Sequence, residues 1–166
     1  MAQAANGFAK SADERSNGSM PRVEGLRSPY DKTCGGLHHL GRMVDKVRLM
    51  QAGGLPEEFH RNYGLSVGLD GQLCGFLGVK FEDVAARVAA GGTDEELTEW
   101  IFAHGLRPNR TQTLVWNEHS RKMGWNDRIS TFVAKIKAEM GIAEHPACTT
   151  FELIEYSEDR SPPVSR

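Results

Sequence analysis

Residues 37–52 read LHHLGRMVDKVRLMQA, and this stretch decides the fold. Its apolar residues recur at steps of three and four, namely Leu37, Leu40, Val44 and Val47. That spacing places them on one side of an α-helix, and the following Gly53-Gly54 pair ends it. We therefore predict a helix that turns its apolar side toward a core.

Similar helix signals follow along the rest of the chain. Apolar residues at helical spacing, bounded by glycine, proline or a capping residue, mark the segments 56–64, 69–78, 81–91, 93–105, 109–124 and 126–141. Two of these segments open with the pattern of a capping box, at Thr93–Glu96 and at Asn109–Gln112. The pattern predicts a mainly α fold, a compact bundle of six or seven short helices.

The segment Thr149–Tyr156 differs, because it is β-branched and aromatic with partial alternation. This composition favours a strand, but a lone strand leaves its backbone groups unpaired. Either the segment is extended against the helices, or it pairs with a second copy of the chain. The fold prediction is therefore a helical bundle with at most one C-terminal strand.

The 166 residues fit a single domain with looser ends. Residues 1–24 mix small, polar and charged residues without a period, and we predict a flexible head there. Residues 25–156 form the predicted helical domain. Residues 157–166, with Pro162-Pro163, are predicted to be a loose tail.

Composition and charge argue against several classes of function. The net charge of −2 does not favour nucleic acid, and no apolar run is long enough to cross a membrane. Three cysteines at wide spacing, without a C-x-x-C pair, fit reduced thiols in the cytoplasm. The chain also lacks an H-x-x-x-H pair and a glycine-rich phosphate loop, so we expect neither a metal nor a cofactor.

Several separated motifs together resemble one bacterial family. The motifs are Leu26-Arg27-Ser28-Pro29, Gly35-Gly36-Leu37, Arg42-Met43-Val44-Asp45-Lys46-Val47-Arg48, Phe76-Leu77-Gly78-Val79 and Trp116-Asn117. In this order, over roughly residues 25 to 155, they resemble the family described as domain of unknown function 5069. The resemblance implies a compact bacterial domain and brings no established activity or catalytic residues. The long head before the first motif departs from the family.

The charged side of the 37–52 helix is the first candidate site. Residues three and four apart are neighbours on a helix, so His38, Arg42 and Asp45 line one stripe, and Asp45 also neighbours Arg48. Guanidinium groups suit a carboxylate or phosphate, and Lys46 adds a point charge one turn beyond Arg42. The alternative is a salt-bridge ladder of Arg42, Asp45 and Arg48 beside the core, which contributes about 0–1 kcal/mol per pair.

A second candidate feature is the pair Trp116-Asn117, a flat ring beside a two-way hydrogen-bonding amide. Its alternative role is structural, with Trp116 in the core and Asn117 tying two helices together. The predicted substrate-binding residues are thus Arg27, Arg42, Arg48, Trp116 and Asn117. The predicted catalytic residues are Asp45, Lys46 and His39.

These residues lead to two functional hypotheses. The first is binding, or cofactor-independent transformation, of a small anionic metabolite in a hollow shared by Arg42, Asp45 and Trp116. The second is a non-catalytic helical interaction module that forms a homodimer through Thr149–Tyr156. The first requires the arginines and the indole to converge on one hollow, and the second does not.

Overall fold

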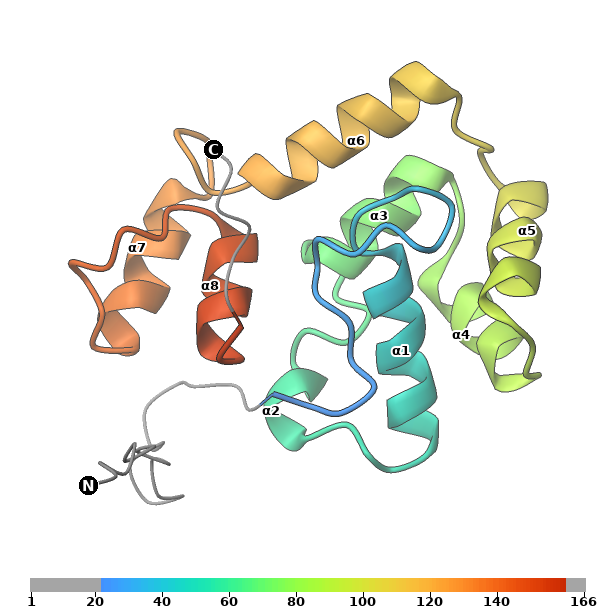
Figure 1. Ribbon diagram of the computed structural model, residues 1–166, viewed down its shortest axis with the longest axis horizontal. Coiled ribbons are helices and arrows are strands. Elements are labelled where there is room, and N and C mark those ends of the chain that lie inside the picture. The colour runs from blue at the N-terminus through green and yellow to red at the C-terminus, as the bar shows by residue number, and fades with distance from the viewer. Residues whose placement is uncertain (1–21, 161–166) are drawn as a thin grey trace, which may run out of the picture.

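The computed structural model describes residues 22–160, which form a bundle of helices without a strand (Figure 1). In chain order the helices are α1 (Leu40–Gln51), α2 (Glu57–His60), α3 (Leu69–Leu77), α4 (Phe81–Ala89), α5 (Asp94–His104), α6 (Arg110–Lys122), α7 (Ser130–Glu139) and α8 (Thr150–Ser157). The predicted mainly α fold is confirmed. The eight helices in these residues exceed the expected six or seven.

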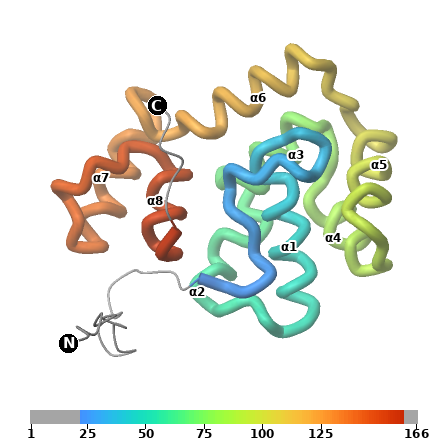
Figure 2. The backbone as a smooth tube through the Cα atoms, in the orientation of Figure 1, coloured from blue at the N-terminus to red at the C-terminus, as the bar shows by residue number. Residues whose placement is uncertain are grey.

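Helix α1 lies at the centre of the larger core. Every residue from Leu40 to Val47 is buried, the charged ones included. The apolar side of α1 packs among the buried leucines of α3 and the valines of α4, as the 37–52 spacing predicts. The tube in Figure 2 shows α1 enclosed by the 22–39 segment, α3 and α4.

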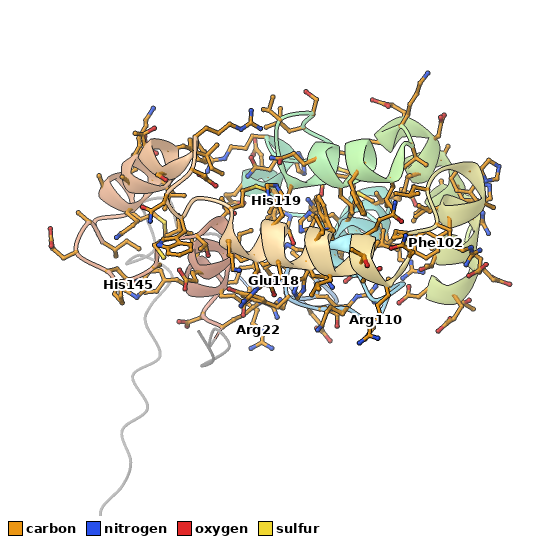
Figure 3. All side chains as sticks on the ribbon, turned by 90° about the horizontal axis from the view of Figure 1, so that it is seen from above. Arg22, Phe102, Arg110, Glu118, His119 and His145 are labelled. Carbon is orange, nitrogen blue, oxygen red and sulfur yellow. The ribbon has the colours of Figure 1, made fainter. Side chains whose placement is uncertain are left out.

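Helix α6 runs across the top of the molecule and connects its two sides (Figures 1 and 3). At one end lie α4 and α5, and at the other lie α7 and α8, which enclose a small core of their own around Val133, Ala147 and Leu153. Trp116 and Ser120 form the buried side of α6. None of the helices in the described part of the chain is long and apolar enough to cross a membrane.

Helix α1 begins at Leu40 because His39 has a left-handed backbone, with φ of 72°. The preceding turn also depends on glycine. Gly35 has φ of +59°, and a Cβ atom there would lie 2.5 Å from the ring of Phe102. The chain therefore makes a tight turn between Gly35 and His39, immediately before α1 begins.

The C-terminal segment is a helix and not the strand that its composition favoured. Thr149 Oγ1 accepts a hydrogen bond from the Glu152 amide, and the Thr149 amide donates to the Glu152 carboxylate. This capping box starts α8, and the side chains of Phe151 and Leu153 are buried on its inner side. The capping box and the burial of Phe151 and Leu153 outweigh the β propensity of the segment. Because the segment is a helix, it does not pair with a second copy as a strand.

The ordered body of the domain also extends past residue 156. Glu158 is completely buried, and Arg160 makes an ion pair with it. Residues 157–160 of the predicted loose tail therefore belong to the body. The rest of that tail, 161–166, and residues 1–21 of the predicted head lie outside the described residues.

The cap of α8 provides a test of this correction. Replacing Thr149 by Ala removes the side-chain acceptor and should lower the free energy of unfolding by about 1 kcal/mol. Thr149→Asn restores an N-cap acceptor and should recover most of that loss. Urea titrations followed by circular dichroism measure both. Equal stability of the Ala variant and the unaltered protein would contradict the role of the cap.

Candidate functional site

The charged side of α1 is neutralised by carboxylates of the same chain, beginning with Asp45. The guanidinium of Arg27 donates to both oxygens of Asp45, at 2.7 Å each, and the Arg27 amide adds a third bond at 3.0 Å. Donating hydrogen bonds to the Asp45 carboxylate raises the pKa of the Arg27 guanidinium above its usual range. Gly41 makes room for the guanidinium, since a Cβ atom there would lie 2.9 Å from it.

Asp94, at the start of α5, extends this network. One of its oxygens accepts from Arg27 and the other from Arg48, both at 2.7 Å. Burial alone would raise the pKa of Asp94, but the two guanidinium groups hold it below its ordinary value. Arg27 and Arg48 are thus joined through one carboxylate.

Arg42 forms a second network with the C-terminal end of α8. Its guanidinium makes a two-pronged contact with Glu158 and donates to the Arg27 carbonyl at 2.7 Å. Arg160 approaches the same carboxylate at 2.8 Å. Arg42 and Glu158 lie 116 positions apart in the sequence, so this contact fastens the end of α8 to α1.

A third network gathers His39 and Lys46 around Asp70. Lys46 Nζ lies 2.6 Å from both Asp70 oxygens, and His39 Nε2 lies 2.8 Å from one of them. The Gly64 amide also donates to Asp70. Burial would raise the pKa of Asp70, but Lys46 and His39 hold it well below its ordinary value. Asp70 is therefore an ionised carboxylate shared by two predicted catalytic residues.

His39 combines several unusual features. Complete burial lowers its pKa to about 4, which keeps the ring neutral. Because a carboxylate only accepts, Nε2 carries the proton and Nδ1 has a lone pair. That Nδ1 atom is buried and has no hydrogen-bond partner within residues 22–160. A neutral His held by an Asp can accept a proton at its free nitrogen. His39 does not line the cavity between α3 and α6 or the groove between α4 and α5.

Trp116 and Asn117 lie apart from these networks. Trp116 stacks on Phe76 with ring centres 5.2 Å apart, and its Nε1 donates to the His38 carbonyl. The Asn117 amide accepts from the His38 amide and donates to the Gly36 carbonyl. Asn117 thus ties α6 to the turn before α1, and Trp116 borders a separate hollow between α3 and α6.

The predicted site residues therefore lie in three ion-pair networks, apart from Trp116 and Asn117, which connect α6 to the turn before α1. Arg27, Asp45 and Arg48 belong together, as do His39 and Lys46, whereas Arg42 pairs with Glu158. These residues do not share a hollow with Trp116. The three partner carboxylates are distant in sequence, which is why the sequence offered no signal for Asp70, Asp94 or Glu158.

A groove between α4 and α5 contains charged groups of a different kind. Its volume is about 490 Å³, and it is lined by Gly78, Val79, Lys80, Asp83, Ala86, Arg87, Trp100 and His104. The side chain of Lys80 makes no ion pair or hydrogen bond with residues 22–160, and within the same residues the Arg87 guanidinium donates only to the Gly91 carbonyl. The lining thus has two cations beside one carboxylate, Asp83.

The opposite wall of the groove is aromatic. Trp100 and His104 are stacked with ring centres 4.1 Å apart and planes 24° apart. His104 Nδ1 lies 2.8 Å from the Trp100 carbonyl, so this nitrogen carries the proton of the neutral ring. Nε2 is then the basic atom. The sequence places Lys80, Asp83 and Arg87 on one face of α4, but the facing wall comes from another helix and could not be foreseen.

The structure contains no group of three or more His, Cys, Asp or Glu side chains that could hold a metal ion among residues 22–160. The model of a protein family described as Domain of unknown function (DUF5069) matches residues 23–160. A search of curated proteins found no match.

The Arg42–Glu158 pair can be tested by removing one charge. Glu158→Gln leaves Arg42 buried without a counter-charge and should lower the free energy of unfolding by about 3–5 kcal/mol. Adding Arg42→Met should recover much of this loss. The matched control is Glu99→Gln, in the exposed Arg107–Glu99 pair, which should leave the urea midpoint unchanged. Similar midpoints for the Glu158 and Glu99 variants would contradict a structural role of the buried pair.

The buried His39 predicts a pH dependence of stability. Its pKa is about 4 in the folded protein, against an ordinary 6.5, so the unfolded chain binds more protons between these values. Stability contributed by His39 is complete above that window and is lost as the pH falls through it, by up to about 3 kcal/mol. Asp70, with its lowered pKa, destabilises the fold only at still lower pH.

His39→Asn tests this effect, because Asn accepts a left-handed backbone and does not titrate. Urea unfolding at about pH 7 and about pH 5 measures the loss of stability on acidification. We expect a smaller loss in the variant than in the unaltered protein, whatever their absolute stabilities. An identical loss in both would exclude His39 as its source.

Proposed function

Since the chain belongs to the DUF5069 family, whose description names no activity, we propose from its own geometry that it binds a small organic anion in the groove between α4 and α5. The observation that carries this proposal is which of the cationic side chains have a carboxylate partner. Those on and around α1 are neutralised by Asp45, Asp70, Asp94 and Glu158. Lys80 and Arg87 face a groove without a carboxylate partner in the described part of the chain.

The lining chemistry defines the class of ligand. A carboxylate or phosphate would pair with Lys80 and Arg87, and the guanidinium can offer two parallel N–H groups. Asp83 would accept a hydrogen bond from a hydroxyl or amino group. Trp100 would cover a flat or apolar part of the ligand. The volume of about 490 Å³ is within the range of small-molecule sites.

His104 is the group that could add chemistry to binding. With its Nδ1 proton held by the Trp100 carbonyl, the basic Nε2 can accept a proton from a bound molecule. A cofactor-independent proton transfer is therefore the form of catalysis that these residues support. The proposal of binding does not require it.

We place this function in the bacterial cytoplasm. The buried cysteines Cys34 and Cys74 are unbridged thiols, which is typical of a reducing compartment. Burial raises the pKa of Cys74 to about 12 and so keeps it an inert thiol. These cysteines contribute to packing rather than to the groove.

Self-association is a second candidate, supported by a different observation. Leu114 and Val115 are adjacent apolar residues that give α6 an exposed apolar face, with exposed fractions of 60% and 59%. Two such faces could pack together as a homodimer. Light scattering across a range of concentrations tests this candidate directly, and a monomer at all concentrations removes it.

Removing the two cations should weaken anion binding. We expect 4-hydroxybenzoate, which has a carboxylate, a flat ring and a hydroxyl donor, to bind saturably in isothermal titration calorimetry. The Lys80→Gln/Arg87→Gln variant should bind it at least about tenfold more weakly, because two charge-assisted contacts are lost. The uncharged 4-hydroxybenzyl alcohol should bind weakly to both proteins.

The matched control removes one lysine and one arginine elsewhere. Arg128→Gln/Lys135→Gln changes exposed residues near and on α7, at the opposite end of the molecule from the groove (Figure 1). It alters the net charge equally and should leave the affinity unchanged. Equal weakening by both double variants would indicate a general effect of charge and would refute the groove as the site.

A further inference from the structure

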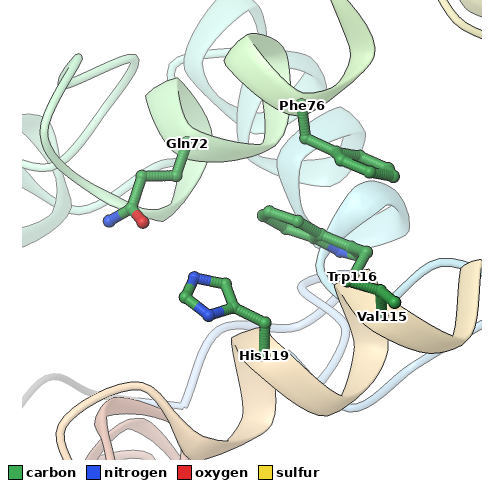
Figure 4. A pocket seen from close by; sticks show the side chains of 5 residues that line it. All are labelled: Gln72, Phe76, Val115, Trp116 and His119. Atoms are coloured by element: carbon green, nitrogen blue, oxygen red, sulfur yellow. The ribbon is translucent and has the colours of Figure 1, made fainter. Parts of the chain in front are cut away.

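A second hollow lies between α3 and α6 and shares no lining residue with the α4–α5 groove. It has a volume of about 280 Å³ and is lined by Gln72, Phe76, Val115, Trp116 and His119. Figure 4 shows Gln72 and Phe76 extending from α3, with Trp116 and His119 extending toward them from α6. Phe76 and Trp116 form the aromatic half of this space, and Gln72 and His119 form its polar half, so each helix contributes one residue to each half.

The aromatic half is held rigidly. The rings of Trp116 and Phe76 lie 5.2 Å apart with planes 21° apart. The indole N–H donates to the His38 carbonyl, so it is not offered to a ligand. Val115 adds an exposed apolar rim. A surface fixed in advance favours a rigid, flat occupant, because neither partner loses much freedom on binding.

The polar half contains hydrogen-bonding groups that remain open. Gln72 Nε2 donates to the Val67 carbonyl at 3.1 Å, and this fixes the amide with Oε1 unbonded among residues 22–160. The ring nitrogens of His119 also make no hydrogen bond with the described residues. One acceptor and one imidazole therefore border the aromatic surface.

The lining contains no Asp, Glu, Lys or Arg. A charged ligand would lose hydration here without gaining a counter-charge, which is costly. A flat ring with a hydrogen-bond donor and an acceptor at its edge matches both halves of the hollow. We propose that the α3–α6 hollow binds an uncharged heteroaromatic ring of a small molecule, with its N–H on Gln72 Oε1 and its ring nitrogen near His119.

Two neighbouring residues of α6 allow a matched test. Val115 and Leu114 are almost equally exposed, but only Val115 lines the hollow. Benzimidazole, which is neutral near pH 8 and has both an N–H and a ring nitrogen, is the probe. Titration followed by NMR should give saturable binding to the unaltered protein, at least about tenfold weaker binding to Val115→Arg, and unchanged binding to Leu114→Arg.

A second pair of measurements tests the polar half. Gln72→Leu should weaken benzimidazole several-fold while leaving naphthalene-type probes, which lack the polar edge, unaffected. Absence of saturable binding to the unaltered protein would overturn the proposal. So would equal affinity of the Val115 and Leu114 variants. A dimer that both arginine variants dissociate would instead identify the hollow as part of a contact between two copies.

Discussion

The fold depends on neutralising the charges of a helix that lies inside it. Helix α1 buries Arg42, Asp45 and Lys46 together with its apolar residues. An isolated buried charge is far more costly than most single contacts in a protein are worth. Partners must therefore be supplied by other segments, and Arg27, Asp70 and Glu158 supply them. Each ion pair accepts only a narrow geometry, so α3, the end of α8 and the 22–39 segment have fixed positions around α1.

The sequence predicts the elements of this fold better than their arrangement. Helices with local signals were foreseen, because spacing and capping boxes such as those of Thr93 and Asn109 depend on residues within one or two turns. The error at Thr149 has the same origin, since β-branched residues were given more weight than a cap formed with Glu152. In the candidate site the charge density of α1 was visible. Its partners were not, because no local pattern connects Arg42 with Glu158.

That difference explains why the density of charge in the sequence does not show which cations have a partner in the fold. In a single sequence, arginines awaiting a substrate and arginines paired with a distant carboxylate have the same pattern. In the structure the cations of α1 have carboxylate partners, whereas Lys80 and Arg87 make no ion pair with the described residues. The alternative prediction, a salt-bridge ladder of Arg42, Asp45 and Arg48 within one helix, is also wrong. Arg42 pairs with Glu158 and Arg48 with Asp94, both outside α1.

The long separation of Arg42 and Glu158 has a consequence for biosynthesis. A ribosome adds about 5–20 residues per second, so the 116 positions between them correspond to a delay on the order of ten seconds. During that interval α1 is already made, but the carboxylate that neutralises Arg42 does not yet exist. The nascent chain can form helices α1 to α6 locally, yet it cannot bury this arginine at low cost. Closure of the domain is therefore coupled to the emergence of its last helix.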